Sequence, residues 1–149
     1  MDLFENLQNY SKYNYQVEDV NELIEQEAFF EMANISKNKT KLRYDIWLDS
    51  VGSSRKNKHN LPRVKIIIDN NMIPISISKN PEFLVDISKY KKIKGIKPVF
   101  DFIAKFEDVL LMHWNEEIDD IDLLGIIFDT LKGLPKDDAI RKYVFNEED

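Results

Sequence analysis

The stretch 61–78 reads LPRVKIIIDNNMIPISIS, and it decides the fold because two alternating apolar runs flank a short polar turn. An apolar residue occupies every second position in 64–68 and again in 73–77. Successive side chains of a β-strand point to opposite faces, so this spacing predicts two strands, each with one core face. Asn70 and Asn71 are predicted to form the turn, because Asn tolerates the positive φ that a two-residue hairpin requires.

A third strand is predicted upstream, in 42–49, where the same period of two recurs. The core-face set there is Leu42, Tyr44, Ile46 and Leu48. A polar loop, 50–62, separates this strand from the hairpin and is long for a connection between paired strands. Pro74 cannot donate a ladder hydrogen bond, which predicts that the last of the three strands lies at an edge of the sheet.

Helical spacing occurs on both sides of the strands. In 1–36 the apolar positions at this spacing are Val20, Ile24, Ala28 and Ile35. In the first of two C-terminal helices they are Val99, Ile103, Phe106 and Leu110, and in the second Ile121, Leu124, Ile127, Phe128 and Leu131. Asp119 or Asp120 is expected to cap the second helix. Gly133 is expected to end it as a left-handed C-cap before Pro135.

The order of the predicted elements indicates an α+β fold. A small three-stranded antiparallel sheet (about 42–78) is covered by an N-terminal helix and two C-terminal helices. The chain 1–149 is expected to be a single domain. Its parts are an acidic helical segment (1–36), the sheet with basic loops (37–97), a helical pair (98–133) and a weakly ordered tail (134–149).

The composition excludes several kinds of site. The chain has 149 residues with no Cys and only 4 Gly, so it has no disulfide, no thiolate ligand and little material for a phosphate-binding Gly loop. The N-terminal residues MDLFEN carry neither a positive region nor an apolar run, which predicts a cytoplasmic protein. No catalytic residue, cofactor or metal site is expected.

The charges are segregated along the chain, although the net charge is only −6. The net charge is −7 in 1–36, +7 in 37–65, +3 in 66–100 and −9 in 101–149. Blocks of this kind either form solvated faces or attract partners of opposite charge.

Clustered acids indicate a face that binds a protein with a basic surface, by electrostatic complementarity. The candidate residues are Glu22, Glu25, Glu116, Glu117, Asp119 and Asp120. A Ca²⁺ or Mg²⁺ site at 116–122 is the alternative, but the EF-hand spacing and its Gly are missing. Capping of the following helix explains these acids better.

A basic patch is the second candidate, because Lys and Arg can contact phosphates without sequence preference. Its residues are Arg55, Lys56, Lys58, Arg63 and Lys65. His59 and His113 could in principle act together in acid–base cleavage of RNA. Nothing in the sequence places these two His residues close together.

Three short motifs, LPRVKI (61–66), MIPISI (72–77) and LLMHWN (110–115), resemble a type of small prokaryotic protein found in phages and mobile elements, sometimes near toxin–antitoxin genes. The resemblance covers about 60–125. The excess of Lys over Arg, 17 to 4, is typical of low-GC genomes. We therefore expect a non-enzymatic protein-binding module that inhibits a host defence or nucleic-acid-handling protein. The alternative is a nucleic-acid-binding or RNase-like component of a toxin–antitoxin pair.

Overall fold

The computed structural model describes residues 17–25, 33–49, 61–90 and 93–145. The strands are β1 (Glu18–Asp19), β2 (Asn34–Ile35), β3 (Ile46–Leu48), β4 (Arg63–Ile68) and β5 (Asn71–Ser76). The helices are α2 (Val20–Glu25), α3 (Lys37–Thr40), α4 (Ile96–Lys105), α5 (Glu107–Trp114), α6 (Asp120–Gly133) and α7 (Ala139–Phe145). All strand pairs are antiparallel, in the order β1-β5-β4-β3-β2, so the predicted α+β class is confirmed.

The sheet contains two more strands than the sequence predicts. The three predicted strands form its centre, although β3 covers only Ile46–Leu48 of the predicted 42–49, and the two-residue strands β1 and β2 lie at its edges. Residues 34–36 were predicted to be helical, but Ile35 pairs with Ile46 in the sheet and is fully buried. Its apolar side chain fits either helical or strand spacing, and the long-range pairing decides between them. The first 16 residues of the predicted helical segment lie outside the described residues.

The predicted β4–β5 hairpin is present, but its turn lies one residue earlier than predicted, which changes the register of the pairing. Ile68 pairs with Asn71, and the left-handed residues are Asp69 and Asn70, with φ of 48° and 65°. Two successive residues with positive φ match the twist of the flanking strands.

Pro74 fits within the sheet because its missing N–H lies on the side away from β4. Its carbonyl accepts from the N–H of Leu84 at 3.0 Å, and N and O of one strand residue point the same way. β5 is not the edge strand that was predicted, because β1 pairs with its first two residues.

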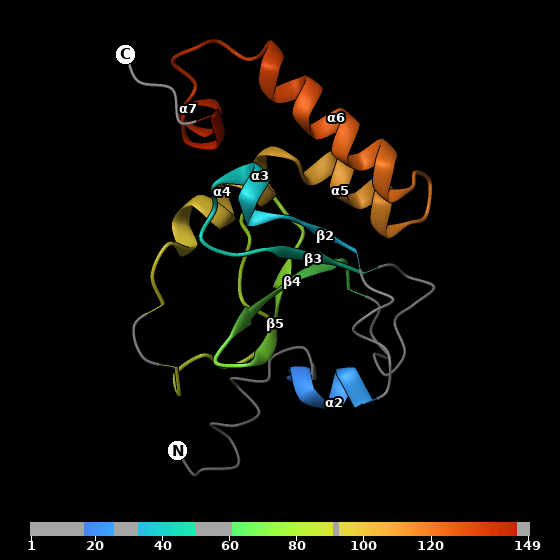
Figure 1. Cartoon of the computed structure of the whole chain (residues 1–149), viewed down its shortest axis with the longest axis vertical. Helices are drawn as coiled ribbons and strands as arrows, with labels where there is room; N and C mark the ends of the chain where they lie inside the picture. Colours follow the sequence, from blue (N-terminus) through green and yellow to red (C-terminus); the bar gives the residue numbers. More distant parts are fainter. Residues whose placement is uncertain (1–16, 26–32, 50–60, 91–92, 146–149) are drawn as a thin grey trace.

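Helices α4, α5, α6 and α7 gather on one side of the sheet, and α2 lies on the other (Figure 1). The main core on the helical side contains Ile66, Ile73, Phe102 and Trp114, which are almost completely buried. Val20 of α2 packs on the opposite face in a separate small cluster with Met72. The sheet therefore separates α2 from the C-terminal helices.

The first C-terminal helix of the prediction is two helices, because the chain breaks at Phe106 between α4 and α5. Phe106 stays buried and its ring packs on Phe102, with ring centroids 4.9 Å apart. The apolar period continues across the break, so the sequence pattern does not reveal it.

The buried stripe of α6 differs from the predicted one. Leu123, Ile127 and Leu131 are fully buried, at spacings of four, whereas Ile121 is 80% exposed. Gly133 belongs to α6 without a positive φ, and the C-cap is Leu134 in an extended conformation. The predicted left-handed Gly cap is therefore wrong, whereas the Asp119 cap is confirmed.

The tail 134–149 was predicted to be weakly ordered, but it contains a helix, α7, that ends at Phe145. Val144 of α7 is buried, and the Arg141 guanidinium donates to the carbonyl oxygens of Lys132 and Leu134 at 2.8 and 2.6 Å. Arg141 thus holds α7 against the end of α6, and α7 also contacts α3 and α4. Among the helices that the structure describes, none has the length and apolar character that crossing a bilayer needs.

Candidate functional site

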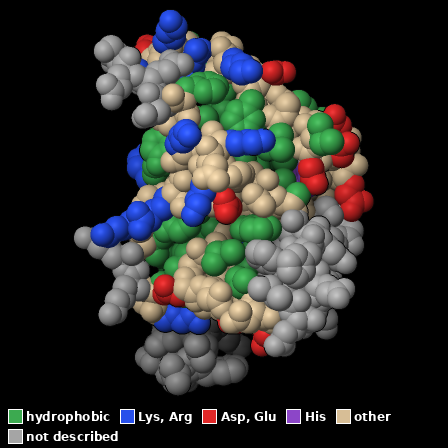
Figure 2. All heavy atoms as spheres, in the orientation of Figure 1, with side chains coloured by type: hydrophobic (Ala, Val, Ile, Leu, Met, Phe, Trp, Pro, Cys, Tyr) green, Lys and Arg blue, Asp and Glu red, His purple; other side chains and the backbone are tan. Residues whose placement is uncertain are grey.

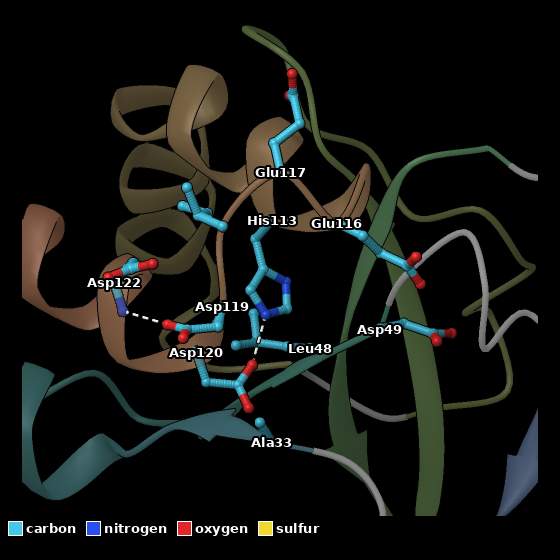
Figure 3. A pocket seen from close by; sticks show the side chains of 10 residues that line it. Ala33, Leu48, Asp49, His113, Glu116, Glu117, Asp119, Asp120 and Asp122 are labelled. Atoms are coloured by element: carbon cyan, nitrogen blue, oxygen red, sulfur yellow. Dashed lines mark hydrogen bonds and ion pairs between the residues drawn. The ribbon is translucent and has the colours of Figure 1, made fainter.

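A groove of about 550 Å³ opens at the turn between α5 and α6, and we call it the acidic groove (Figure 3). Its lining residues are Ala33, Leu48, Asp49, His113, Glu116, Glu117, Ile118, Asp119, Asp120 and Asp122. Asp119 and Asp120 lie on one side of His113, and Glu116 and Asp49 lie on the other (Figure 3). Six acidic residues therefore line the same groove as one imidazole.

The backbone of the α5–α6 turn concentrates the acids. Glu116 has a left-handed φ of 63°, and the N–H of Glu117 donates to the Met112 carbonyl at 2.9 Å, which closes the end of α5. Asp119 then starts α6, since its carboxylate accepts from the Asp122 N–H at 2.8 Å. A tight cap-to-cap connection thus places five acids within 116–122.

His113 lies at the floor of the acidic groove. Its side chain is only 11% exposed, and its Nε2 atom lies 2.5 Å from Oδ1 of Asp120. A carboxylate partner fixes the orientation of an imidazole ring. His113 and Asp120 therefore form a rigid pair that joins the end of α5 to the start of α6.

Asp49, in the opposite wall, is a buried acid whose charge is already compensated. Its Oδ2 atom lies 3.1 Å from Nη2 of Arg63 and 3.6 Å from Nζ of Lys65, with all three side chains at least 93% buried. Arg63 also lies 4.9 Å above the Trp114 ring and donates to the Leu61 carbonyl. These contacts attach the sheet to the end of α5.

Three other acids of the groove, Glu117, Asp119 and Asp122, have a negative charge that no nearby cation among the described residues compensates. Within the described part of the chain, Glu117, Asp119 and Asp122 form no ion pair with a Lys or Arg. No Lys or Arg is among the described residues that line the groove. The groove is therefore a region of negative potential that faces solvent.

The structure brings together four of the six predicted acids. Glu116, Glu117, Asp119 and Asp120 line the groove, whereas α2, which carries the other two, lies across the sheet (Figure 1). Glu22 is exposed there, and Glu25 ends the helix. The predicted acidic face is therefore two separate regions.

Asp49 was not a candidate in the sequence, because its place in the groove depends on long-range pairing of β3 with β4. Asp122 belongs to the same local acid cluster as Asp119 and could have been included from its spacing.

The predicted basic patch is only partly described by the structure. Arg55, Lys56, Lys58 and His59 lie outside the described residues. Arg63 and Lys65 are buried and both pair with Asp49, so neither side chain is presented to a phosphate. The alternation of residues along the strand predicted that Arg63 and Lys65 face away from the core, but it could not show that the buried Asp49 lies beside them. Nucleic-acid binding by 55–65 therefore stays a prediction.

The acid cluster does not have the arrangement of a metal site. Among the described residues, no group of three or more Asp, Glu or His side chains is placed to hold a metal ion. Comparison of the chain with family models, curated proteins and solved structures finds no match. The fold and the groove themselves define an α+β protein with a carboxylate-lined surface groove.

Proposed function

We propose that the protein is a non-enzymatic binding module whose acidic groove receives Lys or Arg side chains from a basic surface of another protein. The observation that carries this proposal is that Glu117, Asp119 and Asp122 line the groove and form no ion pair with a Lys or Arg among the described residues. Clustered charges of one sign accelerate association with an oppositely charged partner and fix its orientation.

Exposed apolar side chains near the groove favour a protein as the partner. Ile121, in the first turn of α6, is 80% exposed, and Met112 of α5 is 39% exposed. Protein interfaces combine apolar contacts with charged groups, whereas a small cation needs no apolar contact. A partner that joins basic and apolar residues would use both features of this surface.

The groove chemistry favours binding over catalysis. His113 with Asp120 has the form of an oriented general base, but no Ser, Thr, Cys or Lys is among the residues that line the groove. The surrounding carboxylates also repel a phosphate substrate. The pair is better explained as a strut that holds the groove in shape.

We further propose that the protein acts in the cytoplasm of a low-GC bacterium as a stoichiometric inhibitor of phage or mobile-element origin. Its target would be a defence or nucleic-acid-handling protein. Such proteins carry basic channels for phosphates, and an acidic groove can occupy such a channel by electrostatic complementarity. The short motifs in 60–125 and the excess of Lys over Arg support this origin.

Charge reversal tests the proposal. In Glu117→Lys/Asp122→Lys, binding of a labelled oligo-lysine peptide should weaken on the order of 100-fold, because each change adds repulsion to the lost attraction. Asp108→Lys/Asp129→Lys is the matched control, since it changes the same charge at exposed positions of α5 and α6 outside the groove. Equal loss in the two variants would show that net charge, not the groove, attracts the peptide.

A further inference from the structure

A second charged surface, of opposite sign, lies on α3 and the segments packed beside it. We call it the basic surface, and its residues are Lys37, Lys39, Lys41, Arg43 and Lys94, all exposed. Lys and Arg side chains predominate on the side that carries α3 and α4, and Asp and Glu gather towards the α5–α6 turn (Figure 2). The acidic protein therefore presents a local cationic region.

Short contacts hold the basic surface in shape. The Tyr44 hydroxyl donates to the Lys94 carbonyl at 2.8 Å, which joins two segments 50 residues apart. Gly95 has a φ of +71°, and an added Cβ there would lie 2.9 Å from Cβ and Cδ of Arg43. The Arg43 stem therefore rests directly on the Gly95 backbone.

Helix α3 is anchored in the same way. The Ser36 hydroxyl accepts from the Asn38 N–H at 3.1 Å, and the Asp45 carboxylate accepts from the Lys37 N–H at 2.7 Å. Thr40 at the end of the helix is fully buried. The exposed Lys side chains thus project from a fixed backbone.

The cations of this surface are not compensated by neighbouring acids. In the described ranges, the side chains of Lys37, Lys39 and Lys94 form no ion pair, and neither does Arg43. The nearest acid in sequence, Asp45, accepts from the Lys37 backbone N–H, and no ion pair joins its carboxylate to a cation of this surface. These exposed cations therefore give the surface a local positive charge.

The residues that form the basic surface are all charged and include no apolar side chain. The exposed large apolar residues of the described chain are Met112, Ile121, Ile126 and Tyr143, of which Tyr143 belongs to α7, the helix that contacts α3. Contacts with a phosphate backbone need only cations and N–H groups. We propose that the basic surface binds the phosphate backbone of nucleic acid without sequence preference, independently of the partner of the acidic groove.

Fluorescence anisotropy with two labelled DNA duplexes of unrelated sequence tests this proposal. Both should bind at about 50 mM salt with similar affinity, and binding should fall steeply towards 200 mM as counterions are released. Lys37→Glu/Lys39→Glu should weaken binding about 10-fold or more and lower the salt slope by about 2. Lys132→Glu/Lys136→Glu, with the same charge change at exposed positions around the end of α6, is the matched control and should bind nearly as the wild type does.

Lys94→Glu removes a cation from outside α3 and should also weaken binding, so the test does not depend on α3 keeping its fold. Absence of binding at about 50 mM salt, or equal binding by Lys37→Glu/Lys39→Glu and the wild type, would overturn the proposal. Competition by poly-glutamate as strong as by unlabelled DNA would also overturn it, because an acidic protein would then be the better ligand. The oligo-lysine test of the acidic groove is unaffected by any of these outcomes.

Discussion

The acidic groove and the basic surface show two ways in which one chain builds a charged region. The acids of the groove come mostly from one stretch, 116–122, which two helix caps fold into a tight turn. The basic surface is assembled from α3, the segment after it, and residues 94–95, which a single hydroxyl and a Gly contact bring together. A charge cluster that lies in one stretch can be recognised from the sequence, whereas a charged surface assembled from distant segments cannot.

The two regions also differ in what their charges do for the fold. The groove contains a buried acid, Asp49, whose contacts with Arg63 and Lys65 join β3 to β4. The cations of the basic surface are all exposed, and the contacts that constrain them involve the backbone and the Arg43 stem. Substitutions should therefore affect stability at the wall of the groove and binding at the basic surface.

The largest effect on stability is expected from Asp49→Asn. Removing one partner of a buried ion pair leaves two buried cations without their carboxylate, which costs about 3–5 kcal/mol. Urea unfolding measures this loss. Asp122→Asn, in the same groove but exposed, should change stability by no more than about 0.5 kcal/mol. Similar losses of unfolding free energy in the two variants would contradict the view that Asp49 supports the fold whereas Asp122 is free to bind a partner.

Gly95→Ala is the next largest and concerns the basic surface. An Ala in the left-handed conformation costs about 1–2 kcal/mol, and its Cβ would also displace the Arg43 stem. Thermal unfolding should show the loss. Gly125→Ala is the control, because a Cβ there meets nothing within 4 Å and α6 should gain about 0.5–1 kcal/mol. If both substitutions raise or both lower the unfolding temperature, Gly95 is not in close contact with Arg43.

The smallest effect on stability is expected at the helix cap of the groove. Asp119→Ala removes the acceptor of the Asp122 N–H and should destabilise the protein by about 1 kcal/mol. Glu117→Ala changes a side chain on the same turn that caps no helix, so it should have little effect on the urea midpoint. A midpoint for Asp119→Ala equal to that of Glu117→Ala would mean that the cap does not hold the turn.

Local patterns predicted a large part of the fold. The period of two identified β4 and β5 with their core faces, because each strand packs one side on the helices. The Asp119 cap was also predicted, since the capping carboxylate and the Asp122 N–H that donates to it are close in sequence. The site followed the same rule, as four of the predicted acids line the groove.

Features that depend on distant residues were not predictable. β1 and β2 have two residues each and exist only through pairing with β5 and β3. Helix α7 carries a weak apolar pattern and is held by Arg141 against carbonyls near the end of α6. Arg63 and Lys65 look like surface cations until β3 places Asp49 beside them.

The most direct test of two independent charged regions is to measure both probes on both reversal variants. Glu117→Lys/Asp122→Lys should lose oligo-lysine binding on the order of 100-fold and retain DNA binding. Lys37→Glu/Lys39→Glu should lose DNA binding about 10-fold or more and retain the peptide. If each variant instead shifts both affinities by the same factor as its matched control, binding follows net charge alone and the two regions are not separate sites.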